Sequence, residues 1–134
     1  MKTNSDLTIY NRVANSETYQ RTQIVGVVWE NRKAANVLAS GGNIAADQAS
    51  IYIPLARGAA YLAPKAWQAL VTKTGKWTLQ NGDYIVKGLV TDTIGTGFTI
   101  TALKAKYDDV LQITSVDTMD SGSPALQHWQ LGAK

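Results

Sequence analysis

The clearest pattern of hydrophobic and polar positions lies at the end of the chain, in residues 110–134. Leu111 and Ile113 alternate with polar residues, and Trp129 and Leu131 do the same. An Asp-Ser-Gly-Ser-Pro cluster, which is typical of a turn, separates the two runs. The pattern predicts a β-hairpin. Because a lone hairpin is only marginally stable in water, this one should complete a larger sheet and bury its last strand in the core.

Runs rich in β-branched and aromatic residues predict further strands earlier in the chain. The first is a short edge strand over residues 6–11. The second is long, over residues 18–30, and Gly26 inside it predicts a bulge or a close backbone contact. Apolar residues alternate again over residues 51–55, where Pro54 should stand at a strand end because proline has no N–H to donate.

A second hairpin is predicted in the middle of the chain. Its strands cover residues 76–79 and 84–90. The four residues between them, 80–83, contain Asn-Gly, which is the strongest short signal for a tight turn between strands.

Two short segments have apolar residues at helical spacing instead. Residues 63–70 predict a helix with Pro64 in its first turn. Residues 101–107 predict a second helix, which Thr101 is placed to cap. A strand over residues 98–103 is the alternative for this second segment.

Residues 31–50 have no clean period and carry Gly41-Gly42 near their middle. They predict a long loop, and a loop of this length in a compact domain is usually functional or disordered. The remaining elements, about seven short strands and two short helices, follow no βαβ rhythm. We therefore expect a single domain over residues 1–134. Its fold class is mainly β: a small antiparallel β-barrel or sandwich with two short helices and a long loop at 31–50.

Composition narrows the function classes. The chain has 134 residues and no cysteine, so it has no disulfide and no thiolate nucleophile or ligand. Its net charge of +3 is a mild bias that permits a polyanionic neighbour without requiring one. No apolar run approaches the roughly 20 residues that span a bilayer, and no signal-peptide block follows the first residues. We expect no membrane partner and synthesis in a cytoplasm.

Candidates for catalysis and metal binding are weak. The one histidine, His128, has no sequence neighbour that marks it as a general base. The acidic residues around Asp117 and Asp120 lack the spacing of a calcium loop, and Gly95-Thr96-Gly97 lacks the context of a phosphate loop. We therefore expect no enzyme, no cofactor and no metal site.

Aromatic residues on the strands of a basic β-domain also suggest a protein that stacks single-stranded nucleic acid on its rings. The residues concerned are Trp29, Tyr52, Trp77, Tyr84 and Trp129. Each lies among aliphatic neighbours, which favours a place in the core. No helix carries the clustered Arg and Lys of a recognition helix.

Several runs of the sequence resemble a family of tailed-bacteriophage structural proteins from the head–tail connection. They include Trp-Glu-Asn-Arg-Lys-Ala-Ala-Asn-Val at 29–37 and Gly-Asp-Tyr-Ile-Val-Lys-Gly at 82–88. The other matching runs are residues 51–54, 107–110, 115–117, 122–124 and 128–129. The resemblance spans nearly the whole chain and carries no catalytic residue.

The resemblance implies a head-closure (stopper) protein in the virion neck, made in the host bacterial cytoplasm. Its implied partners are further copies of itself in a cyclic ring of six or twelve, the portal or adaptor protein, a tail terminator or tail-tube protein, and packaged double-stranded DNA held without sequence specificity. In the loop at 31–50, Arg32 and Lys33 are the candidate contacts with DNA phosphates or a partner, together with Gly41 and Gly42. The alternatives are a tail-terminator ring subunit and, from another class, a small nucleic-acid-binding β-barrel.

Overall fold

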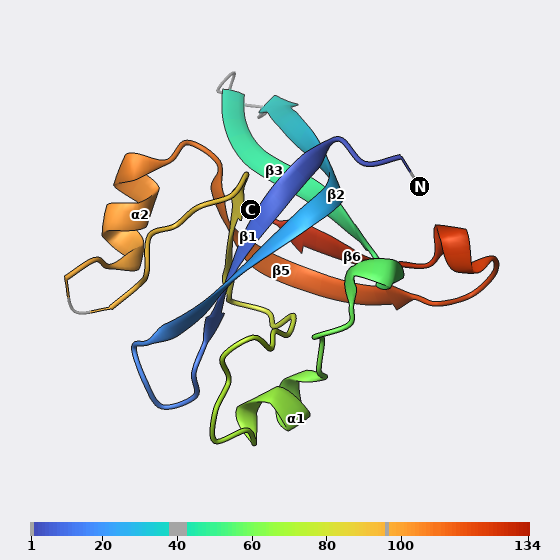
Figure 1. Cartoon of the computed structure of the whole chain (residues 1–134). Coiled ribbons are helices and arrows are strands. Elements are labelled where there is room, and N and C mark those ends of the chain that lie inside the picture. Colours follow the sequence, from blue (N-terminus) through green and yellow to red (C-terminus); the bar gives the residue numbers. More distant parts are fainter. Residues whose placement is uncertain (1, 38–42, 96) are drawn as a thin grey trace.

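The computed structural model describes residues 2–37, 43–95 and 97–134, with residues 32–37 and 43–47 described by their backbone alone. Its centre is a closed β-barrel in the strand order β1-β2-β3-β6-β5-β4, with all neighbouring strands antiparallel (Figure 1). The strands are β1 (Ser5–Arg12), β2 (Tyr19–Val37), β3 (Asn43–Pro54), β4 (Tyr84–Lys87), β5 (Val110–Met119) and β6 (His128–Ala133). The predicted small antiparallel barrel is confirmed.

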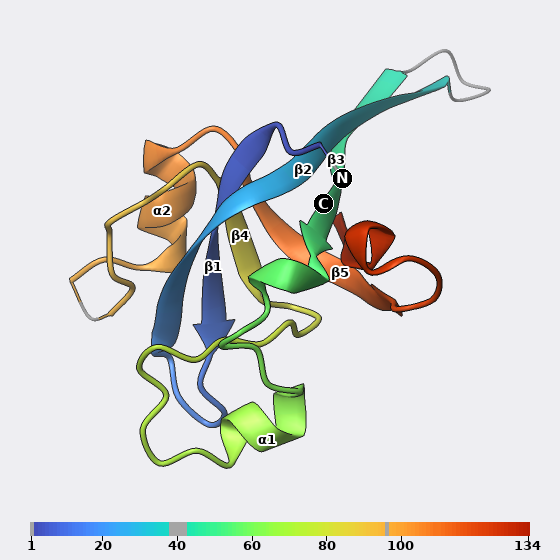
Figure 2. The same ribbon diagram turned by 45° about the vertical axis from the view of Figure 1, so that its right-hand side comes forward.

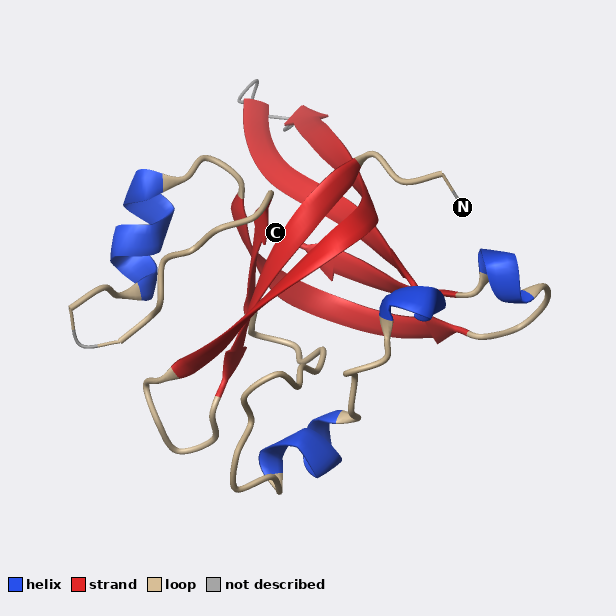
Figure 3. Cartoon of the chain, in the orientation of Figure 1, coloured by secondary structure: helices blue, strands red, loops and turns tan. Residues whose placement is uncertain are grey.

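Short helical segments lie outside the barrel wall (Figure 3). They are the helices α1 (Pro64–Gln68) and α2 (Ile100–Lys106) and the 3-10 turns η1 (Leu55–Arg57) and η2 (Pro124–Leu126). Both predicted helices form, so the strand alternative at 98–103 is wrong. The cap of α2 is Thr99 and not Thr101, because the Thr99 hydroxyl accepts a hydrogen bond from the Ala102 N–H at 3.3 Å.

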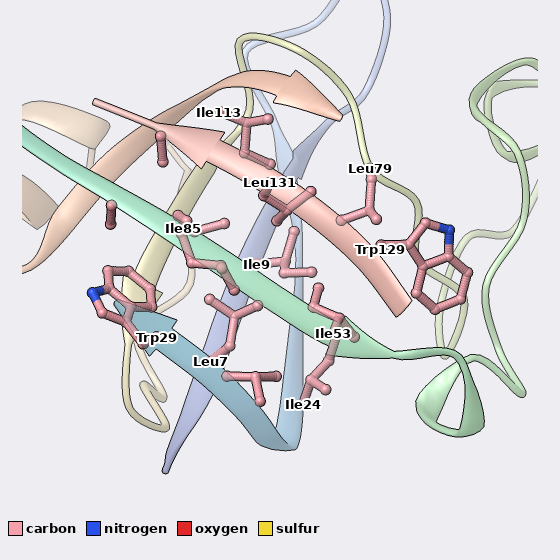
Figure 4. Close-up of a cluster of buried hydrophobic side chains, with 14 of the residues drawn as sticks. Leu7, Ile9, Ile24, Trp29, Ile53, Leu79, Ile85, Ile113, Trp129 and Leu131 are labelled. Atoms are coloured by element: carbon pink, nitrogen blue, oxygen red, sulfur yellow. The ribbon is translucent and has the colours of Figure 1, made fainter. Parts of the chain in front are cut away.

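The barrel interior is filled by side chains from every strand (Figure 4). The buried residues of this core are Leu7, Ile9, Ile24, Val27, Trp29, Ala49, Ile51, Ile53, Trp77, Leu79, Ile85, Ile113, Trp129, Leu131 and Ala133. The last strand lies at its centre, as predicted, because β6 pairs with β3 on one side and with β5 on the other. Pro54 ends β3, as expected of a residue without an N–H.

A second apolar cluster lies between the barrel wall and α2. It consists of Tyr10, Val86, Val90, Ile94 and Leu103. This cluster covers the outer side of β1, which is not an edge strand, contrary to the prediction. β1 pairs with both β2 and β4, and its outward-facing Tyr10 is covered by the chain that follows β4.

Gly26 forms the bulge that the sequence predicted. Its φ is +86°, and the register between β1 and β2 shifts at Ser5 and Asp6, which oppose Val27 and Val25. The Asp6 carboxylate accepts the Gly26 N–H at 3.1 Å. A glycine suits this position because residues with a Cβ rarely adopt positive φ.

The predicted loop at 31–50 is wrong, because its described residues continue two strands. Residues 31–37 belong to β2 and residues 43–50 to β3, and they pair in register from Asn31↔Ala49 to Val37↔Asn43. Sequence periodicity detects a strand that buries one face. Most of these residues pair only with each other beyond the barrel, and their sequence shows no such alternation.

The predicted strand at 76–79 is also wrong. Trp77 makes only an isolated parallel bridge to Tyr61. The turn at 80–83 does form, with Gly82 at a φ of +92° and the Asp83 N–H donating to the Gln80 carbonyl at 3.3 Å. The strand after it, β4, ends at Lys87 and not at residue 90.

Candidate functional site: a projecting ribbon and an open groove

A two-stranded ribbon extends away from the barrel. The pairing of β1 with β2 ends at Ser5↔Val27, and the pairing of β6 with β3 ends at Ala133↔Ala49. Beyond these points the described strands β2 and β3 pair only with each other, over residues 31–37 and 43–48. We call this segment the ribbon. Figure 2 shows it reaching past the barrel wall.

Hydrogen bonds fix the foot of the ribbon where it leaves the barrel. The Asn4 side chain accepts the Trp29 N–H at 2.9 Å and donates to the Trp29 carbonyl at 3.4 Å, so it takes the place of a further β1 residue. The Trp29 indole is buried, and its Nε1–H donates to the Asn31 side chain at 2.8 Å. The ribbon therefore starts from a rigid base.

The predicted contact residues Arg32 and Lys33 belong to the ribbon. Arg32 pairs with Gln48 and Lys33 with Asp47. Gly41 and Gly42 lie outside the described residues.

An open groove runs beside β5, on the side away from β6. Its volume is about 480 Å³. The residues that line it are Tyr61, Pro64, Leu79, Gln80, Asn81 and Val116. The groove lies where the contact of the 82–83 segment with β5 ends. The Ile113 N–H donates to the Asp83 carbonyl and the Ile113 carbonyl accepts the Gly82 N–H, both at 2.8 Å, and Gln112 Nε2 donates to the Gly82 carbonyl at 3.0 Å.

Buried polar side chains hold the wall of this groove. Asn11 donates from Nδ2 to the Thr78 carbonyl at 2.8 Å and to Asp83 Oδ2 at 2.9 Å, and its Oδ1 accepts the Thr78 N–H at 3.2 Å. Asp83 also accepts from Gln80 Nε2 at 2.8 Å and from the Arg12 N–H at 3.2 Å. Burial raises the pKa of the Asp83 carboxyl above 3.8, although these hydrogen bonds oppose the rise.

Comparison with known proteins places the whole chain in one family. The model of a family of unknown function, DUF6751, matches residues 2–134. The chain belongs to this family. No curated protein and no solved structure matches it.

The remaining chemical candidates of this DUF6751 chain lie on β5, on β6 and in the turn between them. His128 Nδ1 lies 2.8 Å from the Leu126 carbonyl, and the His128 ring meets the edge of Tyr52 with 5.3 Å between centroids. Asp117 and Asp120 are exposed. Over the described residues, no group of three or more acidic, His or Cys side chains is placed to hold a metal ion. Nor is any described helix long and apolar enough to cross a membrane.

Sequence reasoning missed the groove in this DUF6751 domain. Its signal was the low apolar content in the second half of β5, where residues 114–119 are exposed except for half-buried Val116. A strand segment with so few apolar side chains has at most one face covered by the core. That pattern predicts solvent beside the strand, and here it marks the groove.

Proposed function

We propose that the protein is a structural subunit of the tailed-phage neck, a ring-forming head-closure protein that joins the portal or adaptor to the tail and retains packaged DNA. The proposal starts from the sequence resemblance over residues 29–37, 51–54 and 82–88. A compact barrel with a projecting arm suits a ring subunit, because the barrel supplies a rigid body and the arm reaches a neighbour or the channel.

The ribbon is the observation that carries the proposal. At about 3.3 Å per residue, the paired residues 31–37 extend the sheet roughly 23 Å beyond the barrel. Ordering the backbone of such an arm costs conformational entropy. Contact with another molecule, or a place in the channel of a ring, offsets that cost.

The charge of the ribbon fits a channel that conducts DNA. Arg32 and Lys33 are basic and Asp47 is acidic, so the described ribbon carries a net charge of +1. A ring repeats this charge once per subunit and so attracts phosphates. A net charge of only +1 per subunit also avoids an affinity for DNA so high that it would stop the DNA from moving through the channel.

Density for the neck of an intact particle tests the proposal. A ring directly beneath the adaptor, with the ribbon toward the channel, is the expected result. A ring that caps the tail tube would make the protein a tail terminator, and absence from the particle would overturn the virion assignment.

The DNA contact has its own test. Arg32→Glu with Lys33→Glu should lower the fraction of filled heads that keep their DNA, and Lys65→Glu with Lys73→Glu, two changes near the distant helix α1, is the matched control. Normal DNA retention in the ribbon variant would remove the DNA contact and leave the neck position untouched.

The small nucleic-acid-binding barrel is less well supported. Stacking on single strands needs exposed aromatic rings. Of the candidate rings, Trp29, Trp77 and Trp129 are buried, with at most 6% of their surface exposed, and Tyr52 and Tyr84 are half-buried.

A further inference from the structure

One edge of β5 lacks a partner strand. β4 pairs with β5 only at residues 110–112, and the 82–83 segment adds bonds to Ile113. Beyond Ile113, β5 pairs with β6 alone, up to Met119↔His128. Among the described residues, no hydrogen bond reaches residues 116–118 from the groove side.

The hydrogen-bond pattern identifies which backbone groups are free. The Leu55 N–H donates to the Gln127 carbonyl, so the odd-numbered residues of β6 face β3. The even-numbered residues of β6 therefore face β5. Their partners are Ser115, Asp117 and Met119. By alternation, the N–H and C=O groups of Val116 and Thr118 point away from β6, over the groove.

The ribbon has a free edge of matching pattern. The Asn4 N–H donates to the Val27 carbonyl, and the Asn4 side chain bonds both backbone groups of Trp29. Odd-numbered residues of β2 thus face away from β3, and the ladder runs without a register shift to Val37. Beyond Trp29, the outward backbone groups start at Asn31 and Lys33.

We propose that the free edge of β5 receives the β2 edge of the ribbon from a second copy of this chain, as an added antiparallel strand. An antiparallel pair joins Val116 and Thr118 to odd-numbered ribbon residues and sets Asp117 opposite an even-numbered one. The register Thr118↔Asn31 and Val116↔Lys33 places Arg32 opposite Asp117. Opposite charges in a cross-strand pair are favourable.

The same rule disfavours the pairing of two β5 edges with each other. The register that uses Val116 and Thr118 of both copies sets Asp117 directly opposite Asp117. Like charges in this position repel. Pairing of the ribbon with β5 is head-to-tail, so each copy offers a donor edge and an acceptor edge, as a closed ring needs. This inference rests on the proposed ring and names its lateral contact.

Disulfide trapping tests the contact, since the chain has no cysteine of its own. Full-length Asp117→Cys and Arg32→Cys proteins are mixed and oxidised. Directly opposed residues that do not bond to each other have Cα atoms about 4.5 Å apart, within the range of a disulfide. We expect the heterodimer to form at least about tenfold faster than in the control mixture of Asp117→Cys with Lys65→Cys, because docking raises the local thiol concentration. Equal rates would overturn the inference.

A proline at the free edge shows whether the contact is strand addition. Thr118→Pro removes an N–H that bonds nothing within the described chain, so the melting temperature should stay close to that of Thr118→Ala. Placed in the Asp117→Cys chain, Thr118→Pro should return trapping to the control rate, and Thr118→Ala should preserve it. A folded Thr118→Pro protein that still traps rapidly would rule out strand addition. The neck density tests the ring function separately, so a ring in the neck without trapping would point to another lateral contact.

Discussion

Replacement of Asn11 by alanine should destabilise the protein strongly, although Asn11 touches no apolar core residue through its polar atoms. Asn11 is fully buried and makes three hydrogen bonds, two to the backbone of Thr78 and one to the Asp83 carboxylate. Alanine would leave the Thr78 N–H and carbonyl without a partner in a buried site. It would also remove one of the donors that support a buried charge.

The expected loss can be worked from these three bonds. An orphaned buried polar group costs about 1–3 kcal/mol, so the two backbone groups and the carboxylate together give about 3–5 kcal/mol after partial relaxation. At a denaturant slope near 2 kcal/mol per M, typical of a domain this size, the urea midpoint should fall by roughly 2 M.

Urea unfolding followed by tryptophan fluorescence measures the loss. Asn81→Ala is the matched control, because Asn81 is exposed in the neighbouring turn and its loss should cost under about 0.5 kcal/mol. A cost below about 1 kcal/mol for Asn11→Ala would refute the reasoning. It would mean that water or a shifted backbone replaces Asn11, and that the groove wall is not held by this network.

Three further predictions concern other parts of the fold. In a carboxyl NMR titration, the pKa of Asp83 should lie above 3.8 because of burial, and the pKa of Asp92 should lie below 3.8 because Tyr107 and Lys106 donate to it. Asp83 thus adds stability at low pH that is lost as pH rises through its folded pKa, whereas Asp92 adds stability that is lost as pH falls through its folded pKa. The reverse order of the two titration midpoints would contradict both assignments. Gly58→Ala should cost about 1–3 kcal/mol in urea unfolding because its Cβ would overlap the buried Trp129 ring, whereas Gly95→Ala, which meets open space, should be near neutral, and equal costs would count against this packing. Single-stranded oligonucleotide should change the tryptophan emission little because all four indoles are buried, and strong salt-dependent quenching would revive the nucleic-acid barrel.

The sequence predicted those elements whose residues bury one face. The β5–β6 hairpin, the inner part of β3 and the long strand through Gly26 all alternate against the core, and the structure confirms them. The helix α1 was marked by Pro64 at its first position. In each case the side-chain pattern and the local backbone preference point to the same element.

The ribbon was missed because its sequence carries no hydrophobic alternation. Ala-rich and polar residues at 31–37 and 43–48 give no alternation for a pattern to detect. The wall of the groove at residues 76–79 was predicted as a strand because its residues have the pattern of a buried strand. Trp77, Thr78 and Leu79 are all buried and look like a strand, yet the Asn11 side chain occupies the N–H and carbonyl of Thr78 that a neighbouring strand would need.

Side chains that take the place of a strand explain the two edges of the proposed contact, the β2 edge of the ribbon and the free edge of β5. Asn11 holds the 78–83 segment against β1, and the described hydrogen bonds of this segment to β5 are at its end, to Gln112 and Ile113. The later residues of β5 then keep their outward backbone groups free. At the opposite end, the Asn4 side chain completes β1 against Trp29, and beyond it β2 continues as the ribbon, paired with β3. Unpaired edges are prone to aggregation unless they are protected or used. Asp117 protects the acceptor edge against a second β5 and favours the strand that carries Arg32, so the same carboxylate should lower non-specific pairing and select the partner.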